Sequence, residues 1–302
     1  MIKIKEIETY VPRNNINLLE KYKSISPKFL SSKIGANFLA RKGKHETVVE
    51  MCKRTLKNLK LKDYKKKIKL IILCTQNPDH GGLPHNSAIL QTDLGLDTNI
   101  ACFDISQGCA GYMYGLKIAD NFLKENEIAL FFTCDPYSKI IRSKDYKTEL
   151  LFGDSASLTV IEKNKKSKKM KSLISSDFYT NGKYYDAIIN SNGVLKMDGK
   201  KVMEFTKEVV PVFIENFLKR NNLKTKDIDR FYFHQGSKHI VSILYERLNL
   251  AKKQCPKFIE NLGNTVSSSI PISLKKDNFK KRKKIILCGF GVGLSISIGL
   301  LI

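Results

Sequence analysis

The chain has 302 residues, and its 53 Lys and Arg against 29 Asp and Glu give a formal net charge of +24. Apolar residues make up 42% and charged residues 27%, which is a globular composition and excludes a disordered or collagen-like chain. The length allows one large domain or two domains of about 150 residues each.

Predicted elements alternate along the whole chain between strands and helices. Apolar runs bounded by turn residues predict strands that are buried on both faces, at residues 69–75, 100–105, 128–133, 157–161, 230–233 and 284–288. Between them lie helical patterns, at residues 47–59, 86–94, 111–124, 201–219, 238–248 and 267–274. This alternation predicts an α/β protein built in layers.

The two ends of the chain argue against targeting segments. The N-terminal MIKIKEIETY alternates charged with apolar residues, whereas a signal peptide needs an unbroken apolar stretch. Residues 285–302 carry no charge and follow KKRKK, which is typical of a membrane anchor. We favour two buried strands around a turn there, because each interior glycine weakens a helix by about 1 kcal/mol and β-branched residues flank the glycines.

The two halves of the chain share one order of elements. In the first half, LIILCTQNPDH is followed by the turn at Cys109, a helix and the strand IALFFTCD. In the second half, RFYFHQGSKH is followed by the turn at Asn264, a helix and the strand KIILCGFG. MIKIKEIETYVP and KSLISSDFYT open the two halves. We predict two copies of one α/β unit, residues 1–165 and 166–302, joined near the lysine cluster at 163–171.

The positive charge limits the possible partners, and the cysteines limit the possible compartment. A basic surface suits an acidic partner such as nucleic acid, anionic lipid or an acidic protein. The alternative is a lysine-rich coding bias, since lysines are spread throughout and the aromatic-basic interleaving of nucleic-acid binders is absent. The seven cysteines form no CxxC pair, so we expect no zinc ribbon or disulfide scaffold and favour a reducing, cytoplasmic compartment.

Cys109 is the first candidate catalytic residue. It lies in DISQGCAGYMYGL, where a strand ends, a glycine turns the chain and a helix begins. Unpaired backbone N–H groups and the positive end of the helix dipole favour a thiolate there. Small neighbours allow a substrate carbonyl to approach the backbone. For the other six cysteines we expect inert, buried side chains.

His234 and Asn264 complete the candidate site. His234 ends the apolar strand in FYFHQGSK, and Asn264 lies in NLGNTVSSSIP. Alone, each has a structural explanation, a buried imidazole or a helix cap. Together with Cys109 they occupy equivalent ends of a duplicated unit. A thiolate that accepts an acyl group and neutral donors that stabilise an oxyanion are the parts of an acyl-transfer site.

These segments resemble β-ketoacyl-acyl-carrier-protein synthase III, a family of thiolase-fold condensing enzymes. FDISQGCAGYMYGL, ELLFGDSASLTVIE, FHQGSK, NLGNTVSSSIP and CGFGVG match in order and span almost the whole chain. The resemblance implies a thiolase-like fold with five αβαβα layers. It implies that Cys109 is the acylated nucleophile, that His234 and Asn264 hold the malonyl thioester carbonyl, and that the N–H groups of Cys109 and Val292 form the oxyanion hole.

Further family positions concern substrate delivery. Leu83 aligns with the residue that a partner subunit lends to the acyl tunnel, so the resemblance implies a homodimer. Lys238 and His239 align with the position that docks the carrier protein. The family's Trp that stacks on coenzyme A is missing, and the stretch PKFLSSKIGANF offers Phe29 and Lys33 instead. An acidic acyl carrier protein is therefore the expected donor.

The resemblance thus predicts a decarboxylative condensation of an acyl thioester with a malonyl thioester, without a metal or other cofactor. The alternative on the same scaffold is an acyltransferase that passes the acyl group to a sugar, amine or hydroxyl acceptor. A third hypothesis, a basic binding or membrane-anchored protein, requires residues 285–302 to be a helix. We expect no nucleic-acid partner and no membrane span.

Overall fold

The apolar runs form two β-sheets in the computed structural model, which describes residues 1–142, 145–164 and 171–302. The strands are β1 (Ile2–Tyr10), β2 (Asn14–Asn17), β3 (Phe38–Arg41), β4 (Ile68–Cys74), β5 (Ala101–Ile105), β6 (Ile128–Cys134), β7 (Ala156–Lys163), β8 (Lys171–Thr180), β9 (Ile188–Ser191), β10 (Val194–Met197), β11 (Arg230–Phe233), β12 (Ile285–Gly291) and β13 (Ser295–Leu301). The predicted strands are confirmed to within a few residues. The small pairs β2–β3 and β9–β10 were not predicted.

The predicted helices are also found, with shifted ends. The helices are α1 (Leu18–Lys21), α2 (Pro27–Phe29), α3 (Val48–Arg54), α4 (Asn86–Asp93), α5 (Gly111–Phe122), α6 (Tyr146–Glu149), α7 (Gly199–Arg220), α8 (Lys238–Arg247) and α9 (Ser269–Lys276). The pattern at 47–59 divides into α3 and a 3-10 turn, η2 (Thr55–Asn58). The last helix begins two residues later than predicted because η11 (Val266–Ser268) precedes it.

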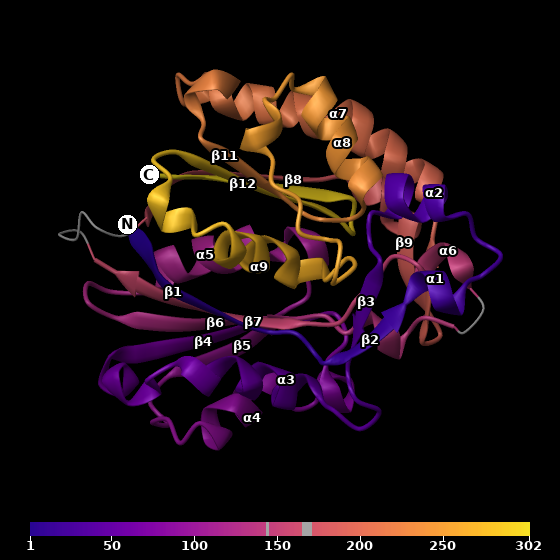
Figure 1. Ribbon diagram of the computed structural model, residues 1–302. Coiled ribbons are helices and arrows are strands. Elements are labelled where there is room, and N and C mark those ends of the chain that lie inside the picture. Colours follow the sequence, from indigo (N-terminus) through magenta and orange to yellow (C-terminus); the bar gives the residue numbers. More distant parts are fainter. Residues whose placement is uncertain (143–144, 165–170) are drawn as a thin grey trace.

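These elements stack in five layers (Figure 1). One outer layer holds α7 and α8, and the sheet beneath it holds β8, β11 and β12. The central layer is α5 and α9, which lie between the two sheets. The other sheet, which holds β1, β4, β5, β6 and β7, carries α3 and α4 on its outer face. The predicted thiolase-like αβαβα arrangement is confirmed.

The two sheets repeat one strand order. The nine strands follow one hydrogen-bonded order, in which a short ladder between β1 and β8 joins the first sheet, β1-β7-β6-β4-β5, to the second, β8-β13-β12-β11. Corresponding strand pairs of the two sheets have the same sense. The pairs β4–β6 and β11–β12 are parallel, whereas β6–β7, β12–β13, β1–β7 and β8–β13 are antiparallel. Within the described residues, only β5 has no counterpart.

β5 departs from its predicted environment. All five of its residues are half-buried, so the prediction of a strand buried on both faces is wrong here. The cause is its place at the open edge of the first sheet, where it pairs only with β4.

One core joins the halves. Side chains from α5 and α9 pack with residues of both sheets in a single buried cluster that includes Phe131 and Leu287. A short ladder between β1 and β8 also links them. The division at 165/166 stays a prediction, and that boundary, with most of the lysine cluster at 163–171, lies outside the described residues.

The C-terminal segment is not a membrane anchor. Residues 285–302 form β12 and β13, which pair along their whole length and are buried throughout. In the part of the chain that the structure describes, none of the helices has the length and apolar character needed to cross a bilayer. The strand prediction is confirmed, and the membrane-anchored hypothesis is wrong.

Two loops from opposite halves are held together at the site. The Asn264 N–H donates to the Leu151 carbonyl at 2.7 Å, and the Gly153 N–H donates to the Asn264 carbonyl at 2.9 Å. A Cβ at Gly153 would overlap the carbonyl oxygen of Leu262. The loop that carries Asn264 can approach the first half only because residue 153 has no side chain.

Gly153→Ala is therefore expected to destabilise the fold by about 1–3 kcal/mol, the usual cost of overpacking. Gly182→Ala is the matched control, since a Cβ there meets nothing within 4 Å, and its change should stay within about 0.5 kcal/mol. Urea unfolding of both variants measures the free energies. Equal stabilities of the two variants would contradict the role given to this close approach.

Candidate functional site

Cys109 lies in a tight 3-10 turn, η6 (Gly108–Ala110), directly before α5. Gly108 has a φ of 51°, and a Cβ on it would overlap the side chain of Gln76. Gly111 packs in the same way against the Cys74 sulfur. The small residues around Cys109 therefore allow β4 and the turn to approach each other closely. The thiol is 6% exposed, at the N-terminal end of the central helix.

β12 passes the other side of Cys109. A Cβ on Gly291 would lie 3.0 Å from the Cys109 Sγ, and one on Gly289 would meet the Cys109 carbonyl oxygen at 2.5 Å. The Ser297 hydroxyl donates to the Ala110 carbonyl at 2.7 Å and fixes the turn to the second sheet. The glycines of CGFGVG thus bring the second half against the nucleophile candidate.

His234 lies at the end of β11, next to β12. Its N–H donates to the Cys288 carbonyl at 2.9 Å, and its ring meets the Phe290 ring edge-on at 5.7 Å. His234 is 3% exposed. Burial lowers the pKa of His234 to about 4, and a backbone hydrogen bond with Val266 raises it by a smaller amount. The imidazole is therefore neutral at physiological pH and can donate one N–H.

Asn264 is oriented by its own loop. Its Oδ1 accepts the Val266 N–H at 2.9 Å, so the carbonyl end of the amide is held against the backbone. This contact also settles the orientation of the amide, because the opposite orientation would place two donors together. The NH2 end remains available as a neutral donor.

Cys109, His234 and Asn264 line one cavity of about 500 Å³. Phe290, Gly291 and Val292 form one wall, and Tyr137, Leu151, Phe152, Ile188 and Met197 are among its apolar lining residues. The structure thus brings the three predicted catalytic residues together from η6, the end of β11 and the loop before η11. No fixed charge lies among these three side chains, so the arrangement suits a reaction that develops negative charge on oxygen.

Two backbone N–H groups contact the thiol. Hydrogen bonds from the N–H groups of Cys109 and Val292 lower the pKa of the Cys109 thiol, and their role as an oxyanion hole stays a prediction. Burial acts in the opposite direction and is the larger effect, and the carboxylate of Asp135 adds to it, so the pKa is raised overall. The backbone N–H groups thus act in the predicted direction, but burial outweighs them, and local geometry at the helix start does not report how deeply the sulfur is buried.

Lys33, Phe29 and His239 also line the cavity. Lys33 Nζ lies 3.3 Å from His239 Nε2, and burial followed by Lys33 lowers the pKa of His239. Lys238 is exposed and donates from Nζ to the Ser31 carbonyl at 2.8 Å. Its position beside these residues is compatible with the predicted carrier docking, which stays a prediction.

Leu83 lies apart from its own chain's cavity. It follows η5 (Asp79–Gly82), and 86% of its surface is exposed. It therefore reaches no acyl group within the same chain, and its predicted place in an acyl tunnel depends on a partner subunit.

Sequence reasoning missed two residues of the site. Ser269 contacts His234, with its Oγ 2.8 Å from Nδ1. Tyr137 donates its hydroxyl to Gln76 Oε1 at 2.6 Å and packs on the Phe152 ring at 4.8 Å. The run SSSIP after Asn264 was the signal for Ser269, since it places polar side chains close to the loop that carries Asn264. We find no local signal for Tyr137.

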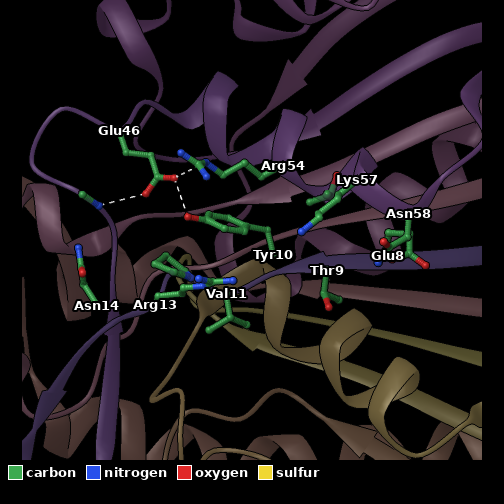
Figure 2. Close-up of a pocket in the computed structure, with 13 residues that line it drawn as sticks. Glu8, Thr9, Tyr10, Val11, Arg13, Asn14, Glu46, Arg54, Lys57 and Asn58 are labelled. Carbon is green, nitrogen blue, oxygen red and sulfur yellow. Dashed lines mark hydrogen bonds and ion pairs between the residues drawn. The ribbon is translucent and has the colours of Figure 1, made fainter.

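A second cavity, of about 830 Å³, lies between the end of β1 and α3 (Figure 2). Glu46 dominates it, accepting the Tyr10 hydroxyl at 2.7 Å and pairing with Arg54 Nε at 2.9 Å (Figure 2). Burial and then Glu46 raise the pKa of Tyr10 to about 12. Tyr10, Glu46 and Arg54 thus pair with one another, and none of the three predicted catalytic residues lines this cavity.

Comparisons with known proteins agree on one family. The family model described as 3-oxoacyl-[acyl-carrier-protein (ACP)] synthase III matches residues 103–182, and the model of its C-terminal part matches residues 218–301. A β-ketoacyl-[acyl-carrier-protein] synthase III of Clostridium perfringens is 29% identical over 95% of this chain and 94% of its own. One of Rickettsia canadensis is 31% identical over 76% and 75%. The crystal structure of the Aquifex aeolicus synthase III has a TM-score of 0.90 at 25% identity, covering 100% of this chain and 99% of its own.

Removing the charge of Asp135 is expected to speed alkylation of Cys109. Burial raises the pKa of Asp135 to about 6, so its carboxylate is ionised above that pH and raises the pKa of the thiol. Asp135→Asn keeps an oxygen for the Gln76 N–H, which Asp135 accepts at 2.5 Å.

Iodoacetamide labelling of the peptide that carries Cys109 measures the effect. At about pH 8 the variant should react several-fold faster than wild type, and at about pH 5, where Asp135 is protonated, the two rates should converge. A variant that reacts more slowly at the higher pH would contradict the assigned direction. Labelling of half-buried Cys102 in the same samples is the internal control.

Proposed function

Since the chain belongs to the 3-oxoacyl-[acyl-carrier-protein] synthase III family, we propose that it condenses an acyl group held on Cys109 with a malonyl thioester, releasing CO2. The observation that carries the proposal is the convergence of Cys109, His234 and Asn264, a thiol and two neutral side chains, on one cavity. The chain is accordingly an acyltransferase of the condensing type.

In the first stage, the Cys109 sulfur attacks the carbonyl carbon of an acyl thioester. The new Sγ–C bond forms as the donor's C–S bond breaks, and the thiol proton leaves with the departing carrier thiol. Negative charge develops on the carbonyl oxygen, where the N–H groups of Cys109 and Val292 stabilise it. Because the resting thiol is protonated, its deprotonation is coupled to binding of the thioester.

In the second stage, a malonyl thioester loses its carboxylate as CO2. The electron pair of the broken C–C bond forms an enolate, whose oxygen accepts hydrogen bonds from His234 Nε2 and Asn264 Nδ2. The enolate carbon attacks the acyl carbonyl on Cys109, the Sγ–C bond breaks, and the released thiolate takes a proton from solvent water. A neutral His234 suits this step, because it donates without protonating the carbanion.

The alternative acyl transfer to a sugar, amine or hydroxyl acceptor is not favoured. Such a transfer needs a base for the incoming nucleophile. His234 has a pKa lowered to about 4, so it is a weak base. The curated relatives are named as synthases.

We also propose that the chain acts as a homodimer. β5 is an unpaired edge strand, and such edges are normally covered or blocked. Leu83 exposes a large apolar side chain. Gly82, which precedes it, lines one cavity with residues of β5, so a partner that covers the β5 edge would bury Leu83. The exposed leucine could then close the partner's acyl cavity, as the resemblance implies. The expected cytoplasmic location stays a prediction.

The donor that we propose is an acidic carrier protein. Phe29 and Lys33 line the cavity where the family stacks coenzyme A on Trp, and the chain contains no Trp. The net charge of +24 attracts an acidic partner at long range. His239 contacts Lys33, and both residues line the cavity. Lys238, the neighbour of His239, contacts the Ser31 carbonyl. Both positions suit such docking.

His234→Ala and Asn264→Ala should separate the two stages. Each removes a donor that acts only on the enolate, and losing one such donor typically lowers the rate by about 10²–10³. Release of labelled CO2 from malonyl-carrier should fall by that factor, while acylation of Cys109, followed by intact mass, should persist. Cys109→Ala is the control that loses the adduct. Wild-type CO2 release by both donor variants would refute the assigned roles.

Carrier-dependent turnover should fall with added salt. The Debye length is about 8 Å at physiological ionic strength, so screening weakens long-range attraction. A small thioester mimic should respond little. Lys238→Glu should raise the apparent KM for acyl carrier only, whereas Lys124→Glu, an exposed lysine just beyond the far end of α5, should leave it unchanged. If acyl-coenzyme A and acyl carrier were used equally and responded equally to salt, a lysine-rich coding bias would explain the positive charge instead.

A further inference from the structure

Ser269 is the one side chain that contacts the catalytic imidazole through a polar atom in the described residues. Its Oγ lies 2.8 Å from His234 Nδ1. Both residues are 3% exposed, so water does not compete for this hydrogen bond. Ser269 is the first residue of α9, the central helix of the second half. The contact therefore joins the site to one of the most buried helices of the fold.

Besides Ser269, the imidazole has a weaker backbone contact with Val266, and the partners of the serine indicate which atom donates. The Gln235 N–H donates to the same Oγ at 3.4 Å, so this oxygen already accepts a hydrogen bond from the backbone. Within the described residues, the only acceptor near the serine hydroxyl is His234 Nδ1. If Nδ1 carried the proton instead, the serine hydroxyl would face two donors and its own proton would be buried without an acceptor, which is costly.

We infer that Ser269 is a positioning residue that holds neutral His234 in the tautomer with the proton on Nε2. This inference rests on the proposed function, in which Nε2 donates to the enolate oxygen. A neutral imidazole has a single N–H, so the atom that faces Ser269 determines what the opposite atom can do. The other tautomer would turn a lone pair toward the negative oxygen and oppose the second stage.

The first stage does not use this proton. Attack of Cys109 is assisted by the backbone N–H groups of Cys109 and Val292. Loss of the serine hydroxyl should therefore slow decarboxylation and leave acylation unchanged. A serine with a merely structural role would affect both stages alike.

The direct measurement is the tautomer of His234 in the wild-type chain. With 15N-labelled histidine, long-range proton–nitrogen correlations distinguish the protonated from the unprotonated ring nitrogen. The chain has five histidines, and a His234→Gln sample identifies the signal that disappears. A protonated Nε2 supports the inference, and a protonated Nδ1 overturns it. This result stands whether or not the proposed function holds.

Variants on α9 supply the kinetic test. Ser269→Ala should lower CO2 release from malonyl-carrier by about tenfold to a hundredfold, with acylation of Cys109 within about twofold of wild type. Ser273→Ala is the matched control: it is buried one turn later on the same helix, and its hydroxyl donates to the Ser269 carbonyl at 2.7 Å.

Ser269→Thr keeps a hydroxyl and should restore much of the rate and the Nε2–H signal. Equal CO2 release by Ser269→Ala and Ser273→Ala would overturn the inference, as would a single, unchanged Nε2–H signal in Ser269→Ala. If wild type released no CO2, the proposed function would fail, and the tautomer measurement would still decide the role of Ser269.

Discussion

The close approach of β12 to the turn at Cys109 is the constraint on which the site depends. Gly289 and Gly291 leave room for the Cys109 backbone and sulfur, and any side chain at either position would push the second sheet away. That approach brings the Val292 N–H to the sulfur. It also places β11, the parallel neighbour of β12, so that His234 at its end faces the same cavity. One backbone contact thus assembles parts from both halves of a duplicated fold.

Burial then determines the chemistry of the assembled site. It keeps His234 neutral and Cys109 protonated in the free chain. A site of neutral donors in a low-dielectric cavity stabilises an oxyanion more strongly than the same groups do in water. It also keeps water from the carbanion that the second stage forms. Burial also makes the resting Cys109 thiol less reactive, so its activation depends on the arrival of a substrate.

Sequence reasoning predicted the large-scale pattern of this molecule. Apolar runs such as 128–133 lie at the sheet centre, where burial on both faces leaves a continuous hydrophobic signature. Cys109, His234 and Asn264 could be predicted because Cys109 and Asn264 precede the corresponding central helices of a duplicated unit, because His234 ends a buried strand, and because their segments match a known family. Their convergence on one cavity agrees with that prediction, and their catalytic roles remain proposals.

What the sequence could not reveal depends on contacts between distant residues. The edge position of β5 follows from sheet order, which no local pattern in ACFDI encodes. The raised pKa of Cys109 reflects burial by both halves, whereas the helix start suggested only the opposing dipole. The contact of Ser269 with His234 joins residues on separate elements. These features appear only once the two sheets and the central helices are packed.

The most direct test of this account follows the mass of the intact chain through both stages. An acyl thioester is added first, excess donor is removed, and malonyl-carrier is then supplied. The account predicts one acyl adduct, its complete loss after the second addition, and equal amounts of CO2 and of a 3-oxoacyl product extended by two carbons. Discharge of the adduct to a hydroxyl or amine acceptor without release of CO2 would contradict it.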